Sequence, residues 1–338
     1  MNLRRFLIRK AVYVVLTIFF IASLNFFLVQ ILPGMLSPDP EEATRFLLPR
    51  GGGGASTSTN ATRDLIIREW GLDKSILERY VIYLGNLIQG NWGRSATYKS
   101  GIPVADIIGS RLIFTVAWVG IATALTMWFG LFLGRISGWY RGRPRDIAIT
   151  LGGLTGYSMP TFWISLVLLF MFAYAIDIFP ASMDVSPELY NADFLTQLPD
   201  RAYHMILPII TFVISNFAIF TLTLRNSLTD VLTEDFMLTA RAKGLTDQEQ
   251  LQRHALPNAR LPVLTVGAFY FGWVLSGAIL VEIVFSLPGI GRLEWDAVLQ
   301  SDGPLLSAVF LLSTIGVVVA NAIADVLYVF VDPRVREA

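Results

Sequence analysis

The chain contains no cysteine and only two histidines among its 338 residues. Without cysteine, a disulfide framework, a thiolate nucleophile and a cysteine-ligated metal site are all excluded. His204 and His254 fall on opposite sides of the membrane predicted below, so they cannot share a metal ion or a proton relay. The motifs His-Glu-x-x-His and Gly-x-Ser-x-Gly are also missing, as is any paired-carboxylate spacing on one loop. We therefore expect neither an enzyme nor a metal or cofactor bound by this chain.

Charged residues are scarce as well. They make up 15% of the chain, against about 25% in a typical soluble domain. Hydrophobic residues make up 54%, and the mean hydropathy is +0.57, which indicates a membrane protein. Lys and Arg together equal Asp and Glu at 26 each, so no overall positive field suggests nucleic acid as a partner. The glycine run 51–54 lacks the following Lys-Ser/Thr pair of a phosphate-binding loop, and we interpret it as a loop or linker.

Six segments are long and apolar enough to cross a hydrocarbon core of about 30 Å, which takes about 20 helical residues. They are residues 11–32, 112–134, 148–176, 206–224, 263–285 and 305–331. The first could be a cleaved signal peptide, but it exceeds the roughly 7–15 apolar residues of such a signal, so we interpret it as an uncleaved span. The sequence thus predicts an all-α, polytopic membrane protein with six transmembrane helices.

The distribution of positive charge predicts which side of the membrane each loop occupies. Fifteen of the 26 Lys and Arg residues fall in the two termini and in the two loops on the same side, against Arg201 and Arg292 in the two short loops opposite. The remainder lie in the long segment 33–111, which counts little in the positive-inside rule. We therefore expect both termini to be cytoplasmic.

Three regions follow from this topology. Residues 1–32 form the cytoplasmic N-terminus and first span, 33–111 an extracytoplasmic segment, and 112–338 a five-helix core with a cytoplasmic loop at 225–262. In the second region, apolar residues recur at helical spacing from Arg63 to Ile88, which predicts short amphipathic helices broken at Gly71 and packed on the outer face. In the third, glycines and Pro160 within 148–176 predict a kink or a close helix contact.

Two acidic residues lie within predicted spans, Glu282 near the outer end of the fifth and Asp325 toward the inner end of the sixth. Acids at such depth normally face a bundle interior or an aqueous cavity, so both are functional candidates. The alternative, which their positions near span ends favour, is that they hold helix ends or a subunit contact. Asn216 is interpreted as an interhelical hydrogen-bonding residue, whereas Phe269 and Tyr270 are candidates to line a path.

The sequence of the loop 225–262 predicts a folded structure within it. Phe236 to Lys243 is composed of helix formers, and Gly244 supplies a left-handed exit. Thr246 and Glu249 have the spacing of a capping box that starts a second helix, which Pro257 limits to about three turns. Apolar residues accompany the charges on these capped helices, as expected of a helix that docks in the groove of a partner.

At these residues the chain resembles the permease subunits of ABC importers. Their motif, Glu-Ala-Ala, three residues, Gly, nine residues and Ile-x-Leu-Pro, is matched here by Ala240, Gly244, Leu256 and Pro257 and departed from at Leu238 and His254. The oligopeptide, dipeptide and nickel branch typically shows D-Y-V-x-T-A-R-A-K-G-L and then R-H-A-L-x-N-A, which is very similar to residues 235–259. Further resemblance lies in L-P-G at 32–34, G-N-W-G-R-S at 90–95, Y-S-M-P-T-F-W at 157–163, V-E-I-V-F-S-L-P-G-I-G at 281–291 and D-V-L-Y-V-F-V-D-P-R-V-R at 325–336.

The resemblance implies a type I importer permease fold, and specifically the first permease subunit, which has the larger extracytoplasmic segment. Residues Gly51 to Asn60 depart from the usual compact form of that segment. The loop 225–262, below called the coupling loop, would contact an ATPase subunit. The residues that the resemblance and the capping pattern assign to this contact are Asp235, Thr239, Ala240, Arg241, Ala242, Lys243, Gly244, Leu245, Thr246, Glu249, His254, Leu256 and Pro257.

The implied partners are a second homologous permease, two ABC ATPases that carry ATP and Mg²⁺, an extracytoplasmic substrate-binding protein and the lipid bilayer of a prokaryotic inner membrane. The implied cargo is di- or oligopeptides, and the same machinery serves nickel or oligosaccharides in related systems. An ion-coupled secondary transporter is the alternative from another class. Six spans with acids near their ends fit that class poorly, since it usually shows internal repeats and unwound helices at the midplane.

Overall fold

The computed structural model describes residues 3–32, 65–71, 73–274 and 278–331. Within these ranges the chain is helical, and the one β-type contact is an isolated bridge between Arg94 and Pro103. The segment Gly51 to Asn60 lies outside the described residues. The all-α class expected from the hydropathy is confirmed for the part of the chain that the structure describes.

The long helices are α1 (Leu3–Phe26), α6 (Val104–Trp139), α7 (Pro144–Ser158), α10 (Ile206–Val231), α14 (Leu261–Trp273) and α17 (Gly303–Val331). Shorter α-helices are α5 (Ile76–Ile88), α8 (Thr161–Leu169), α9 (Phe194–His204), α11 (Asp235–Ala242), α12 (Asp247–Glu249), α13 (Leu256–Ala259), α15 (Ile279–Val284) and α16 (Ile290–Leu299). Three π-helical turns, η1 (Phe27–Ile31), η2 (Phe170–Ala175) and η4 (Gln250–Ala255), and one 3₁₀ turn, η3 (Pro187–Leu189), complete the order.

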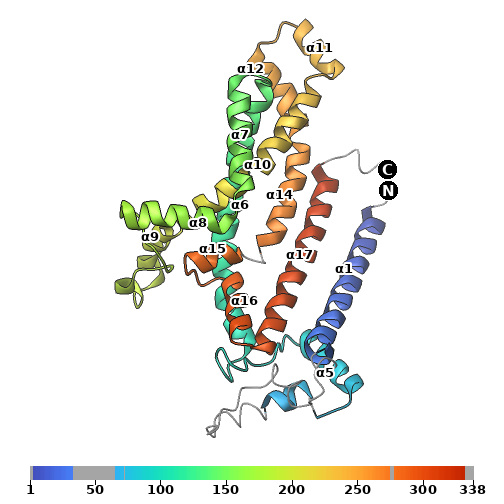
Figure 1. The fold of residues 1–338 in the computed structure, drawn as a ribbon. Coiled ribbons are helices and arrows are strands. Elements are labelled where there is room, and N and C mark those ends of the chain that lie inside the picture. Colours follow the sequence, from blue (N-terminus) through green and yellow to red (C-terminus); the bar gives the residue numbers. More distant parts are fainter. Residues whose placement is uncertain (1–2, 33–64, 72, 275–277, 332–338) are drawn as a thin grey trace.

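The long helices run roughly along one direction, with α11 and α12 at one end of the molecule and α5 at the other (Figure 1). Helix α1 runs from the α11 side toward α5, and α17 returns beside it. Side chains tie the two helices together along their length. Lys10 forms an ion pair with Asp325, and Asn25 Nδ2 donates to the Ser307 carbonyl at 3.0 Å. The start of α1 and the end of α17 therefore lie on the same side of the bundle.

The centre of the bundle is the contact between α6 and α10. Gly130, Gly134 and Gly138 follow one another at four-residue intervals on α6 and face α10. A Cβ atom at Gly130 would lie 2.4 Å from the Cβ of Phe220, and one at Gly134 would lie 2.8 Å from the Thr221 carbonyl oxygen. Small residues at this spacing let helix backbones approach closely, as is common in membrane bundles. The sequence carries this pattern, but we did not predict the contact from it.

The predicted kink in 148–176 is confirmed as a sharp break. Helix α7 meets the helical run formed by α8 and η2 at an angle of 97°, with Met159 and Pro160 between them. Proline at this point removes a helical hydrogen bond and fixes the backbone, so the chain turns away from the bundle. The expected close contact is present too, because a Cβ at Gly156 would lie 2.8 Å from the Ile214 carbonyl oxygen of α10.

Among the described residues, four helices are long and apolar enough to cross a membrane, and five if the bent pair α7 and α8 is counted as one span. Three predicted spans lie within single helices that extend beyond them: 112–134 within α6, 206–224 within α10 and 305–331 within α17. The predicted span 263–285 is instead divided between α14 and α15, with residues 275–277 outside the described ranges.

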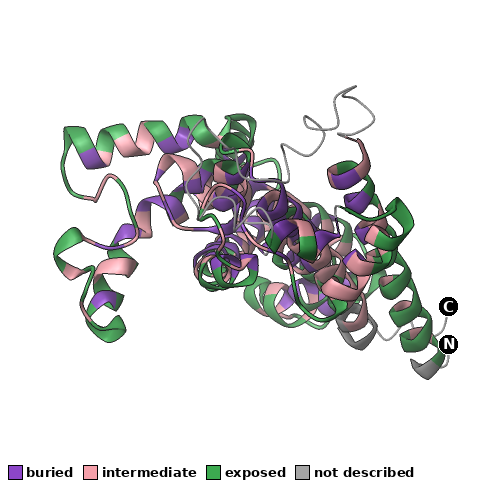
Figure 2. Cartoon of the chain, turned by 90° about the horizontal axis from the view of Figure 1, so that it is seen from below, coloured by how far each residue is buried: buried purple, intermediate pink, exposed green. Residues whose placement is uncertain are grey.

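Apolar side chains are exposed on the outward faces of these helices. Val15 and Phe20 of α1 are 65% and 67% exposed, and Ile113 and Trp128 of α6 are also exposed. Buried residues concentrate where helices meet, as Figure 2 shows in a view from below the bundle. Exposed apolar surface of this extent indicates contact with lipid or with another subunit.

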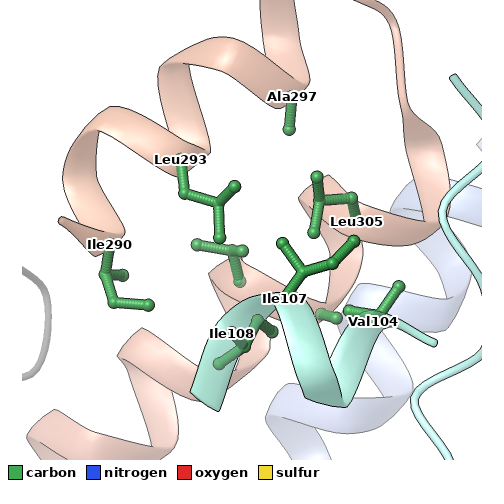
Figure 3. Packing of buried hydrophobic residues seen from close by; sticks show 9 residues of the cluster. Val104, Ile107, Ile108, Ile290, Leu293, Ala297 and Leu305 are labelled. Carbon is green, nitrogen blue, oxygen red and sulfur yellow. The ribbon is translucent and has the colours of Figure 1, made fainter. Parts of the chain in front are cut away.

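At the α5 end, two apolar clusters hold the connecting segments to the bundle. Residues 65–70 are helical, Gly71 breaks the helix at φ +60°, and Ile66, Trp70 and Tyr83 pack against Phe26 of α1, as the amphipathic pattern predicted. A second cluster joins the beginning of α6 to α16 and α17, where Ile107 and Ile108 pack against Ile290, Leu293 and Leu305 (Figure 3).

Candidate functional site

The coupling loop forms a compact helical unit at the end of the molecule (Figure 1). Helix α11 spans Asp235–Ala242, close to the predicted 236–243. Met237 and Ala240 are buried on its inner face, whereas Leu238 is 59% exposed. The structure therefore separates residues that pack within this chain from residues that are free to meet a partner.

The turn from α11 into the next helix has the predicted geometry. Gly244 has φ +71°, the left-handed conformation that favours glycine, and no atom outside its immediate chain neighbours lies within 4 Å of a Cβ placed there. Gln250, which we did not single out, is buried and closes the turn by donating from Nε2 to the Leu245 carbonyl at 2.7 Å.

The capping box is also confirmed. The Glu249 amide donates to Thr246 Oγ1 at 3.3 Å, and Glu249 Oε2 accepts from the Thr246 amide at 3.0 Å and from its hydroxyl at 2.8 Å. These hydrogen bonds hold the pKa of the Glu249 carboxyl below its usual value. Because the folded pKa is depressed, this contribution to stability is complete above the unfolded pKa and is lost as the pH falls through the folded one.

The expectation that Pro257 limits the second helix was wrong. Helical backbone continues from α12 through the π-turn η4 into α13, which ends at Ala259. Pro257 lies in the first turn of α13, a position where its missing N–H is tolerated and its fixed φ suits a helix. The change from π to α hydrogen bonding just before it accommodates the proline without ending the helix.

An apolar cluster connects this unit to the bundle. Met237 of α11, Ala255, Leu256 and Ala259 pack against the buried Leu228 of α10. His254, the second departure from the general motif, is half-buried, and its carbonyl accepts from Asn258 Nδ2 at 2.8 Å. Helix α11 and the helical run after it therefore share one apolar core with α10.

A polar network below the coupling loop locks three helices together. Asp146 of α7 accepts from Arg225 of α10 through both oxygens, from Nε at 2.6 Å and from Nη2 at 2.7 Å. Ser137 of α6 donates to the same carboxylate at 2.5 Å, and the Gly142 amide donates to it at 2.8 Å. Neither Asp146 nor Arg225 was predicted as part of a site, because the two lie 79 positions apart in the chain.

A cavity of about 630 Å³ lies between α6, α8, α10, α14, α15 and α16. Its wall is mainly apolar and includes both Phe269 and Tyr270, the aromatic residues expected to line a path. Asn216 lies at the wall as well and also joins helices, because Tyr270 Oη donates to its Oδ1 at 3.4 Å. Glu294 of α16 lies on the same wall and was missed, because the predicted spans placed it in an outer loop.

Glu282 is fully buried beside this cavity but does not line it. Its Oε1 accepts from Thr115 Oγ1 and Trp118 Nε1, each at 3.1 Å, and its Oε2 accepts from the Arg292 amide at 2.9 Å. Asp325 pairs with Lys10. Both carboxylates join helices of this chain, which agrees with the alternative that they hold structure.

A third carboxylate, Asp302, was not predicted although a signal was present. It precedes Gly303 and Pro304 at the start of α17 and caps that helix, accepting from the Leu305 amide at 3.1 Å. It also accepts from the Ser95 hydroxyl at 2.6 Å and from the three amides of residues 96–98 at 3.0–3.1 Å. Asp302 thus fastens the segment before α6 to the beginning of α17.

Comparison with known proteins identifies the family to which this chain is similar. Residues 130–337 match the family described as binding-protein-dependent transport system inner membrane component. The oligopeptide transport system permease protein AppB of Bacillus subtilis (strain 168) is 34% identical over 278 residues, which cover 82% of this chain and 86% of that protein. The di/tripeptide transport system permease protein DppB of Pseudomonas aeruginosa (strain UCBPP-PA14) is 32% identical over 98% of both chains.

The glutathione transport system permease protein GsiC of Escherichia coli (strain K12) is 31% identical, again over 98% of both chains. The family match covers more than half of this chain, and the relatives are similar to it over most of their length. The non-catalytic role expected from the missing motifs is that of a transmembrane transport subunit. The chain belongs to the family of binding-protein-dependent transport inner membrane components, the permease subunits of ABC importers.

Proposed function

We propose that this chain is the first of two permease subunits in an importer of di- and oligopeptides, and that its coupling loop receives the force of ATP hydrolysis. The observation that carries the proposal is the coupling loop itself. It is folded, capped and packed on α10, and it leaves Leu238 exposed at the end of the molecule. A solvated connector has no need of such rigidity.

The proposed topology has six crossings, with both termini and the coupling loop in the cytoplasm. Its support is that the start of α1 and the end of α17 lie on the same side, toward α11 (Figure 1). The bent pair α7 and α8 and the divided pair α14 and α15 supply the third and fifth crossings. Arginines 135, 141, 143 and 145 flank the junction of α6 and α7 at the same end, as the positive-inside rule requires of a cytoplasmic loop.

The proposed complex contains a second permease, two ATPases that bind ATP and Mg²⁺, and an extracytoplasmic binding protein. Closure of the ATPases would displace α11 to α13. The shared core with Leu228 and the Asp146–Arg225 pair would carry this displacement into α6, α7 and α10 as one body. A rigid element of this kind is what a transition between inward-open and outward-open states needs.

Peptides are the proposed cargo because the relatives are permeases of oligopeptide, di/tripeptide and glutathione transport systems. Nickel and oligosaccharides are the other cargoes to compare. No group of three or more His, Asp or Glu side chains suited to a metal ion occurs in the described ranges. Those ranges therefore give nickel no particular support.

The cargo is tested with the complete complex reconstituted in proteoliposomes with its binding protein. We expect ATP-dependent uptake of labelled di- and tripeptides. Labelled Ni²⁺ and oligosaccharides serve as parallel substrates under the same conditions. Uptake of either of these without any uptake of peptide would overturn the proposed cargo but leave the importer assignment intact.

The docking role is tested at Leu238. Its side chain is exposed, so Leu238→Asp changes the surface offered to an ATPase without disturbing the buried Ala240, where a charge would damage the loop itself. We expect the variant to fold normally and to lose transport, either because ATPase subunits no longer copurify or because hydrolysis is uncoupled. Leu195→Asp, at an exposed leucine of α9, is the matched control and should transport normally. Normal transport by Leu238→Asp would contradict the docking role.

A further inference from the structure

The cavity between α6, α8, α10, α14, α15 and α16 contains one charged side chain among its described lining residues, Glu294. The rest of its wall is formed by apolar groups and by the neutral polar side chains of Thr161, Asn216 and Tyr270. A volume of about 630 Å³ falls within the range of roughly 300–1,000 Å³ that is typical of sites for small organic ligands. The cavity is therefore large enough for a short peptide or for the leading part of a longer one.

Glu294 differs from the two fully buried carboxylates, Glu282 and Asp302. Glu282 accepts three hydrogen bonds from Thr115, Trp118 and the Arg292 amide, and Asp302 accepts five. Glu294 is half-buried, yet it has no hydrogen bond or ion pair with any residue that the structure describes. Burial raises the pKa of its carboxyl, as expected of an acid that loses water and gains no partner.

A desolvated carboxylate without a partner is costly, and a cationic ligand that enters the cavity removes that cost. The polar groups at the wall offer complementary sites, because Asn216 and Tyr270 already form a hydrogen-bonded pair there that could reorient toward a peptide group. The cavity thus combines an apolar wall for side chains, neutral polar groups and one negative charge. This combination suits a small molecule with an ammonium group and an amide backbone.

We infer that Glu294 binds the α-ammonium group of peptides passing through this chain's half of the translocation path. The inference rests on the proposed function, because it takes peptides as the cargo. The carboxylate is a recognition group for one end of the cargo and not a structural acid. It would favour peptides with a free amino terminus over peptides in which that terminus is blocked.

The test compares one labelled tripeptide with its N-acetylated form in proteoliposomes that contain the complete complex. The measured quantity is the ratio of kcat/KM for the free peptide to that for the acetylated peptide, in wild type and in Glu294→Gln. Any preference of the binding protein is the same in both complexes and cancels when the ratios are compared. We expect Glu294→Gln to lower the ratio by at least about tenfold, as the loss of a charge-assisted contact predicts, through slower uptake of the free peptide.

Asp296→Asn is the matched control, because Asp296 lies on the same helix but does not line the cavity. It should keep the wild-type ratio. An unchanged ratio in Glu294→Gln, while peptide uptake continues, would overturn this inference and leave the proposed function standing. If wild type takes up no peptide in either form, the proposed function fails first.

A separate measurement addresses the one competing occupant, a basic side chain of the second permease subunit. Copurification of the two permeases is compared in wild type and in Glu294→Gln. We expect equal recovery of the second subunit from both. Loss of that subunit in the variant would show that Glu294 is an interface counter-ion, and would overturn its assignment to the cargo.

Discussion

Two neighbouring regions each contain a glutamate, but the surroundings of the two carboxylates differ. At the junction of α15 with α6, Glu282 is surrounded by donors from Thr115, Trp118 and the Arg292 amide. On the cavity wall formed by α16, Glu294 has no such donors among the described residues. Both are glutamates in apolar surroundings, so residue type and hydropathy do not distinguish them. The number of hydrogen-bond donors around each carboxylate distinguishes them. It separates a carboxylate that holds helices together from one that is available to a ligand.

The comparison predicts that the Glu282 junction tolerates almost no change in volume. Gly289 has φ −97°, which alanine can adopt, but an added Cβ would lie 2.1 Å from the Glu282 carboxyl carbon. We expect Gly289→Ala to destabilise the protein by about 3 kcal/mol or more, since overpacking combines here with displaced hydrogen bonds. Thermal unfolding in detergent, followed by size-exclusion chromatography, measures this effect.

The control for that change is Gly152→Ala. Gly152 is exposed in α7, and no atom lies within 4 Å of a Cβ placed on it beyond its own helix and neighbours. We expect no loss, and a small gain is reasonable because alanine favours helix more than glycine does. Equal stability of Gly289→Ala and wild type would contradict the view that the junction is closely packed around Glu282.

The next largest effect on stability is expected when the Glu282 carboxyl is replaced by an amide. Glu282→Gln keeps the shape of the side chain but replaces one accepting oxygen with an NH₂ group. The N–H groups of that amide then face donors that need an acceptor. We expect a loss of about 1.5–3 kcal/mol in the free energy of unfolding, the range for hydrogen bonds to a charged group. Glu188→Gln, at an exposed residue of η3, is the control and should leave the unfolding temperature unchanged. A loss as small as that of the control would show that the Glu282 hydrogen bonds contribute little.

A carboxylate that is surrounded by donors also joins helices at the opposite end of the bundle. Arg225→Lys keeps the positive charge beside Asp146 but cannot make both contacts of the guanidinium, at 2.6 Å and 2.7 Å. We expect a loss of about 1–2 kcal/mol in the free energy of unfolding. Arg253→Lys alters a 72% exposed partner of Glu249 and should cost less than about 0.5 kcal/mol. Equal effects of the two substitutions would show that the paired hydrogen bonds between Arg225 and Asp146 add no more stability than an exposed ion pair.

Local features of this fold could be predicted from sequence because their causes are local. The capping box of Thr246 and Glu249, the left-handed Gly244 and the break near Pro160 each depend on residues a few positions apart. The segments 112–134, 206–224 and 305–331 are helical because their apolar runs are long. Hydropathy did not reveal that the segment 263–285 is divided between α14 and α15, because its apolar composition is continuous.

The polar contacts could not be predicted, because each joins residues far apart in the chain. Ser95 and Asp302, Asp146 and Arg225, and Thr115 and Glu282 meet only after the helices have packed. Hydropathy also gave no reason to single out Glu294, because it shows only that α16 lies between two apolar segments and not that its carboxylate reaches the cavity wall. Three-dimensional packing therefore decides which acids are structural.

The smallest expected effect on stability is that of Glu294→Gln, and it completes the comparison. The carboxylate has no protein donor to lose, and a neutral amide is less costly to remove from water. We expect the unfolding free energy to stay within about 0.5 kcal/mol of wild type or to rise slightly, in contrast to Glu282→Gln. Thermal unfolding of the two variants side by side, with no peptide present, makes the measurement. A loss for Glu294→Gln as large as for Glu282→Gln would mean that both acids hold the fold, and the distinction between a saturated and a free carboxylate would fail.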